Sequence, residues 1–136
     1  MAVSNPYAQY QSNQMTTVGP DKLLLMAYDG AIRFAKIGRE KINAGIIDEK
    51  SINIGKSQAI IAELLVTLNP DVAPELVASL SGLYSYIFNR LTEANLNDDA
   101  RAADEAIGIL SDLRDAWSQA AQIWREQSAD AERLAA

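Results

Sequence analysis

The sequence has no histidine and no cysteine among its 136 residues. Catalysis by a Ser-His-Asp or Cys-His arrangement is therefore excluded, as are disulfide bonds and zinc sites built on imidazole or thiolate. A carboxylate-bridged di-iron site is not expected either, because it needs a Glu-x-x-His pair on each of two helices. We expect no catalytic, metal-binding or cofactor-binding residues, and we expect that the protein is not an enzyme.

Basic residues are also in the minority. The sequence has 12 lysines and arginines against 18 aspartates and glutamates, which gives a net charge of −6. Proteins that wrap duplex nucleic acid need many uncompensated basic side chains, so no nucleic-acid partner is expected. No apolar run approaches the roughly 18 residues that span a membrane, and no secretory signal is visible at the N-terminus. We expect no membrane insertion and a cytoplasmic location.

What the sequence does have is helical periodicity in four long segments. Apolar residues recur at alternating spacings of three and four, and no segment shows the alternation of a strand. We expect helices over about residues 20–43, 48–68, 74–95 and 98–126. Because the links between them are short, successive helices should pack antiparallel. The predicted fold is all-α, an up-down four-helix bundle over residues 19–126, with a leader over residues 1–18 and a tail or helix extension over residues 127–136.

Two apolar residues break the amphipathic pattern. Ile60 projects from the polar arc of the second predicted helix, and Tyr86 projects from that of the third. Single exposed apolar residues are common, so an ordinary surface is one interpretation. The other is that both residues belong to grooves that bind an amphipathic helix of a partner. The second helix favours the partner interpretation, because it carries a further apolar strip, Ala59, Ala62 and Val66.

Several motifs resemble one family. The segments NPYAQYQ (residues 5–11), LLLMAYDGAIRFAK (23–36) and LYSYIFNRLTEAN (83–95), with a looser match in IGILSDLRDAWSQA (107–120), resemble the flagellin-export chaperone family, FliS. The resemblance covers nearly the whole chain, in the same order and at the same separations. It implies a cytoplasmic, non-enzymatic chaperone with an elongated antiparallel four-helix bundle. Such a chaperone binds the C-terminal, helix-forming segment of flagellin, prevents its premature polymerisation and helps to deliver it to the flagellar type III export apparatus.

The resemblance also implies roles for individual residues. An N-terminal segment, with a short helix that carries Tyr7 and Tyr10, is expected to be a mobile lid that occupies a groove when the client is absent. Together with Ile60 and Tyr86, these tyrosines are the candidate client-binding and lid residues. The other motif positions are expected to serve packing and polar contacts: Asn5, Pro6, Met26, Tyr28, Asp29, Gly30, Arg33, Phe34, Tyr84, Arg90, Leu91, Glu93 and Asn95.

An alternative function fits the same bundle. An adaptor or regulator that binds another amphipathic helix, for example an anti-sigma factor or a co-chaperone, would have a similar pattern of apolar residues. Only the YDGAIRF and YIFNRLTEAN matches favour the export chaperone over this alternative. Whether the free protein forms a homodimer through its apolar grooves is left open.

Overall fold

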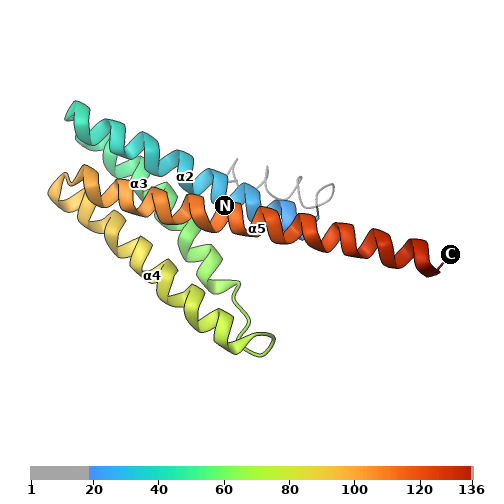
Figure 1. The fold of residues 1–136 in the computed structure, drawn as a ribbon. Helices are drawn as coiled ribbons and strands as arrows, with labels where there is room; N and C mark the ends of the chain where they lie inside the picture. Colours follow the sequence, from blue (N-terminus) through green and yellow to red (C-terminus); the bar gives the residue numbers. More distant parts are fainter. Residues whose placement is uncertain (1–18, 136) are drawn as a thin grey trace, which may run out of the picture.

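The computed structural model describes residues 19–135, and residues 1–18 and 136 lie outside the described part of the chain. The described residues form four helices and no strand: α2 (Pro20–Ala44), α3 (Ile47–Val66), α4 (Pro74–Asn97) and α5 (Ala100–Ala135). The prediction of an all-α protein with four helices is therefore confirmed for this part. In Figure 1 each helix runs back against the direction of the one before it. Helix α5 continues beyond residue 126 to Ala135, so this segment is a helix extension, one of the two forms expected for it.

The ends of the helices follow from local sequence. Helix α2 begins with Pro20 in its first turn, and α4 begins in the same way with Pro74. Proline suits this position, because its fixed φ is helical and its missing N–H would have no intrahelical partner. Helix α2 ends at Gly45, whose φ of 72° is left-handed, and α4 ends at Asp98, whose φ is 51°. Both residues are therefore C-terminal caps of the left-handed type.

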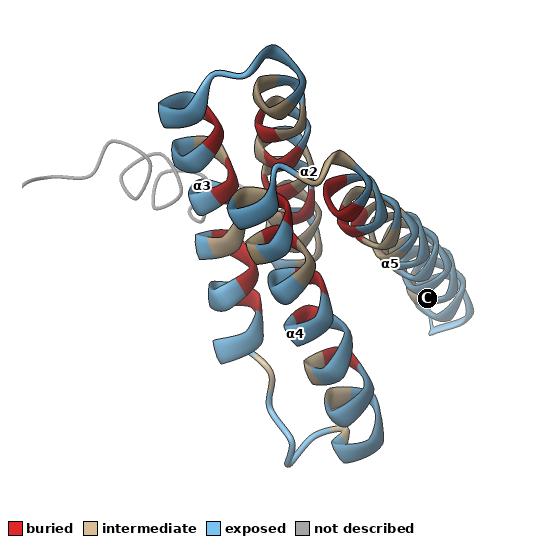
Figure 2. Cartoon of the chain, turned by 90° about the vertical axis from the view of Figure 1, so that its left-hand side faces the viewer, coloured by how far each residue is buried: buried red, intermediate tan, exposed pale blue. Residues whose placement is uncertain are grey.

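Each of the four helices packs mainly against two of the others. Helix α2 packs against α3 and α5, and α4 packs against the same two helices. Helices α2 and α4 touch only lightly, and within residues 19–135 α3 and α5 do not meet. Figure 2 shows the buried residues of α2, α3 and α4 turned toward one another, while the far half of α5 is almost entirely exposed. The common core therefore lies at the end of the molecule that contains the first half of α5.

The core combines large and small side chains. Its largest fully buried members are Tyr28, Tyr84, Ile54, Ile61, Ile87, Leu91 and Leu110. Small residues line the faces of α2 and α5 that meet their neighbours: Ala31, Ala35 and Gly38 on α2, and Ala102, Ala103 and Ala106 on α5. A Cβ atom added at Gly38 would lie 2.5 Å from Cγ1 of Ile54. Helices α2 and α3 can therefore approach closely only because this position has no side chain.

Three ion pairs run along the seam between α2 and α5. Arg125 pairs with Asp21 at 2.9 Å, Arg114 pairs with Asp29 at 3.0 Å, and Arg39 pairs with Asp104. Exposed pairs of this kind each contribute only about 0.2–1 kcal/mol. Their main effect is to fix the register of α5 along α2.

The prediction that Ile60 projects from the surface is wrong. Its side chain is only 6% exposed and belongs to the core. One turn earlier, the ammonium group of Lys56 lies 5.4 Å from the centre of the Phe34 ring of α2. The Lys56 side chain therefore extends over α2 instead of away from it, and Glu49, on the same polar side of α3, pairs with Lys41 of α2. Ile60, on this side of α3, is buried in the core.

Candidate functional site

The outward face of α3 is apolar and exposed. Five residues spaced by three and four positions lie on this face, opposite the buried row of the helix, and we call them the α3 outer strip: Ile52, Gly55, Ala59, Ala62 and Val66. Ile52 is 55% exposed and Val66 is 83% exposed. A Cβ atom added at Gly55 would meet nothing within 4 Å. The strip is a shallow, uncharged surface with small residues at its centre, so another helix can approach it closely.

The strip exists because α3 is apolar on two opposite sides. Its inner row, which includes Ile54, Ile61 and Leu64, is buried in the core. A surface helix normally carries polar side chains on the side away from the core. Among residues 19–135 no helix packs on the α3 outer strip, so it is a candidate surface for a partner.

Helix α4 also has exposed small residues. Ala78, Gly82 and Ser85 are all exposed on α4. The side-chain amide of Gln58 on α3 donates to the backbone oxygen of Phe88 at 3.1 Å and to Oγ1 of Thr92 at 2.8 Å. These bonds link the side of α3 next to the strip to α4.

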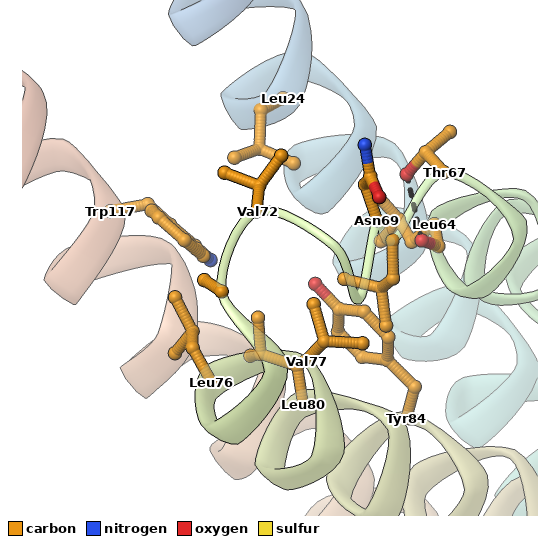
Figure 3. Close-up of a pocket in the computed structure, with 12 residues that line it drawn as sticks. Leu24, Leu64, Thr67, Asn69, Val72, Leu76, Val77, Leu80, Tyr84 and Trp117 are labelled. Carbon is orange, nitrogen blue, oxygen red and sulfur yellow. Dashed lines mark hydrogen bonds between the residues drawn. The ribbon is translucent and has the colours of Figure 1, made fainter.

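A pocket lies where the link between α3 and α4 folds back toward α2 and α5, and we call it the end pocket (Figure 3). Its volume is about 300 Å³. It is lined by Leu24, Leu64, Thr67, Leu68, Asn69, Val72, Ala73, Leu76, Val77, Leu80, Tyr84 and Trp117. None of these side chains is charged. Val72 and Leu76 are 78% and 50% exposed, so the pocket opens to solvent beside exposed apolar residues.

A chain of three aromatic residues lies beside the end pocket. The indole Nε1–H of Trp117 donates to Oη of Tyr28 at 3.1 Å, and the hydroxyl oxygens of Tyr28 and Tyr84 are 2.5 Å apart. Figure 3 shows the Tyr84 hydroxyl directed toward the centre of the lining residues. Burial raises the pKa of the Tyr28 hydroxyl. Burial, together with the hydrogen bond to Tyr28, also raises the pKa of Tyr84.

The two tyrosines predict a loss of stability in alkaline solution. Above a pH of about 10 the unfolded chain loses these two protons while the folded chain keeps them. The free energy of unfolding is therefore unaffected below that pH, and above it falls by at most about 1.4 kcal/mol per pH unit for each tyrosine. Urea unfolding of wild type and Tyr84→Phe between about pH 9 and 11 measures this dependence. The variant should show the shallower fall, and equal slopes would contradict the assignment.

The structure does not bring the candidate residues Ile60 and Tyr86 together. Ile60 is buried in the core, whereas Tyr86 is 45% exposed on α4 and its hydroxyl donates to Glu105 of α5. Arg90 binds the same carboxylate, with Nε 2.9 Å from Oε2. Tyr86 is thus exposed as predicted, but its hydroxyl is engaged at the seam between α4 and α5. Tyr7 and Tyr10 lie outside the described residues, as do Asn5 and Pro6.

The remaining motif positions lie in the packing and polar contacts of the helices. Tyr28, Tyr84 and Leu91 are buried, and Met26, Gly30 and Phe34 are half-buried. The charged positions make the following contacts: Asp29 with Arg114, Glu93 with Arg90, and Arg33 over the Phe34 ring at 5.0 Å. Asn95 accepts hydrogen bonds from Lys50 and Ser51 of α3.

Two features of this region are not evident from the sequence. Lys50 is only 6% exposed, and its Nζ donates to the backbone oxygen of Asn95 at 2.9 Å and to Oδ1 of Asp98 at 2.7 Å. This lysine binds the C-terminal end of α4, and no local pattern distinguishes it from a surface lysine. The end pocket is the other feature, because its lining comes from four helices and a link.

Residues 19–135 contain neither a membrane-spanning helix nor a metal-binding cluster. None of the helices in this range combines the length and the apolar character needed to cross a membrane. The same range contains no group of acidic side chains arranged to hold a metal ion.

Comparison with known proteins gives a consistent result. A family model described as "Flagellar protein FliS" matches residues 3–123. The flagellar secretion chaperone FliS of Bacillus subtilis (strain 168) is 40% identical over 126 residues, which is 93% of each chain. The protein of the same name from Salmonella typhimurium is 33% identical over 115 residues, 83% of this chain and 85% of the other. A crystal structure of a flagellar chaperone from bacteria matches with a TM-score of 0.71 and 26% identity, covering 85% of this chain and 94% of the other.

Proposed function

Because the chain belongs to the FliS family of flagellar secretion chaperones, we propose that it binds the C-terminal, helix-forming segment of flagellin. It thereby keeps flagellin from polymerising in the cytoplasm and helps to deliver it to the flagellar type III export apparatus. The resemblance carried by the three sequence segments is confirmed by this membership, and the family is one of chaperones, not of enzymes.

The α3 outer strip is the observation that supports this function. It runs from Ile52 to Val66, which corresponds to about 21 Å, or four turns, of a helix. A flagellin segment that is helix-forming but unassembled exposes an apolar face of its own. Contact with the strip buries that face, and the same contact removes it from other flagellin molecules. An elongated antiparallel up-down bundle suits this task, because it presents the strip on a rigid platform.

Calorimetric titration with the C-terminal peptide of flagellin from the same organism tests the proposal. The peptide should bind, and an unrelated amphipathic helix of equal length and charge should bind much more weakly. Absence of binding would contradict the chaperone function. Equal binding of both peptides would instead favour a general helix adaptor.

Residues 1–18 are proposed to act as a lid that competes with the client through Tyr7 and Tyr10. The described chain starts at Gly19, and Leu24, just over one turn later, already lines the end pocket. The leader therefore joins the helices beside apolar surface that it can cover.

Deletion of residues 1–15 tests the lid. The truncated protein should bind more of the dye ANS when free, because apolar surface is uncovered, and it should bind the flagellin peptide more tightly. Both are measured by fluorescence and calorimetry against the full-length chain. If dye binding and peptide affinity are both unchanged, the segment is a tail without this role.

A further inference from the structure

Three cations lie together on α2 and α3 without a carboxylate partner in the described part of the chain. Within residues 19–135, seven of the 12 lysines and arginines form ion pairs: Arg39, Lys41, Lys50, Arg90, Arg114, Arg125 and Arg133. Among the others, Arg33 and Lys36 of α2 and Lys56 of α3 are exposed neighbours, and we call them the basic cluster. The protein has 18 acidic residues, so the cluster does not result from a shortage of carboxylates.

The Phe34 ring lies between two of these cations. The guanidinium carbon of Arg33 is 5.0 Å from the centre of the ring, and Nζ of Lys56 is 5.4 Å from it. The two charges are therefore at most about 10 Å apart, which is one Debye length in 0.1 M salt, so their fields overlap. Lys36 follows Arg33 by three positions and is its neighbour on the surface of α2. The basic cluster is thus a concentration of positive charge that spans two helices.

The carboxylates of α2 near the basic cluster do not neutralise it. Asp29, one turn before Arg33, is held by Arg114 of α5 at 3.0 Å. Glu40, one turn after Lys36, supplies one negative charge against three positive charges. A carboxylate from a partner would balance the cluster further. A polyanion such as nucleic acid would instead be repelled by the protein as a whole, because its net charge is −6.

The basic cluster borders the α3 outer strip on one side only. Lys56 follows Gly55 and precedes Ala59 by three positions, so it lies beside the centre of the strip, on the side of α2. On the other side of the strip, Ser51 and Gln58 are uncharged and donate hydrogen bonds to α4. A helix docked on the strip therefore meets charged side chains of α3 along one edge and none along the other.

We propose that the basic cluster binds a carboxylate of the client helix and that this contact determines which edge of the client faces α2. The contact lies at the rim of the interface, where a charge pair changes the association rate and its salt dependence more than the lifetime of the complex. Glu63 lies seven positions after Lys56, about 10 Å further along the same edge, and is negative. The client carboxylate therefore lies beside Lys56 and not beside Glu63. This inference rests on the proposed function, since flagellin is taken as the client.

Association kinetics with the flagellin peptide test the contact. Lys56→Gln should bind about two- to fivefold more weakly than wild type at a salt concentration of about 0.05 M, mainly because association is slower. At about 0.5 M salt, where the Debye length is only about 4 Å, the difference should vanish. Arg101→Gln is the matched control, because it removes an exposed cation of α5 that also has no carboxylate partner within residues 19–135. Melting temperatures establish that both variants are folded.

A double-mutant cycle identifies the client carboxylate. Each aspartate or glutamate of the peptide is replaced in turn by the corresponding amide, and the affinities for wild type and Lys56→Gln are measured by calorimetry. One replacement should weaken binding to wild type and cause no further loss in Lys56→Gln. If no peptide carboxylate couples to Lys56, or if Arg101→Gln slows association as much as Lys56→Gln, the contact is wrong and the proposed function stands. If the peptide does not bind wild type, the proposed function is wrong, and this contact with it.

Discussion

The variant Ala59→Arg should bind the flagellin peptide at least about a hundredfold more weakly than wild type, with almost the same melting temperature. Ala59 lies at the centre of the α3 outer strip and is exposed, so an arginine there points to solvent and costs the free protein little. In the complex the same guanidinium would be buried between two apolar helices without a partner. Loss of about 3 kcal/mol is typical for such an unpaired interfacial charge and corresponds to roughly two orders of magnitude in Kd.

A matched control separates this effect from added charge alone. Ala131→Arg makes the same substitution at an exposed position near the end of α5, away from the strip. It should leave both affinity and melting temperature unchanged, as measured by calorimetry and circular dichroism. Wild-type affinity in Ala59→Arg would show that the client does not use the α3 outer strip.

The second large effect is a loss of thermal stability, and it is expected at Ile60, the residue that follows Ala59. Ile60→Asp removes a buried aliphatic side chain and places a carboxylate in the core. The combined cost is about 4 kcal/mol or more, a large part of the total stability of a domain of this size. The melting temperature should fall by about 10 °C or more. Ala59→Asp, one residue earlier on the exposed side of α3, should lower it only slightly.

Comparing Ile60→Asp with Ala59→Asp shows which of the two side chains is buried, because the residues are adjacent and the introduced carboxylate is the same. Thermal denaturation followed by circular dichroism gives both values. If Ile60→Asp melts close to wild type, Ile60 is on the surface as its sequence neighbours suggest, and the packing of α2 on α3 is wrong. If Ala59→Asp unfolds the protein, the α3 outer strip is part of a buried interface.

The sequence predicted the helices well, because helix formation is governed by local periodicity and by local end signals. Gly45 and Pro74 mark helix ends by their own backbone preferences, so no knowledge of tertiary contacts was needed. The family motifs were also readable, since they are contiguous segments of the chain.

Predictions that depend on which helix covers which face were less successful. Ile60 lies among polar residues of α3, and its burial follows only once α2 is placed over that arc. The same reason applies to Lys50, whose acceptors Asn95 and Asp98 come from a helix that follows much later in the chain. The apolar strip Ala59, Ala62 and Val66 is visible in the sequence, but its exposure follows only from the burial of the opposite row of α3. Periodicity shows which residues share a face of a helix, but it does not show which other helix packs on that face.

The small residues of the α3 outer strip have a consequence for the thermodynamics of binding. Alanine and glycine have no side-chain rotamers to lose, so the central part of the strip gives up almost no side-chain conformational entropy when a client docks. The cost of ordering is then carried almost entirely by the client, which must fix its backbone as a helix. Affinity on such a surface is governed by the intrinsic helix propensity of the client segment as much as by its apolar contacts. Complexes with clients of identical apolar faces should therefore differ in lifetime according to how readily each client forms a helix by itself.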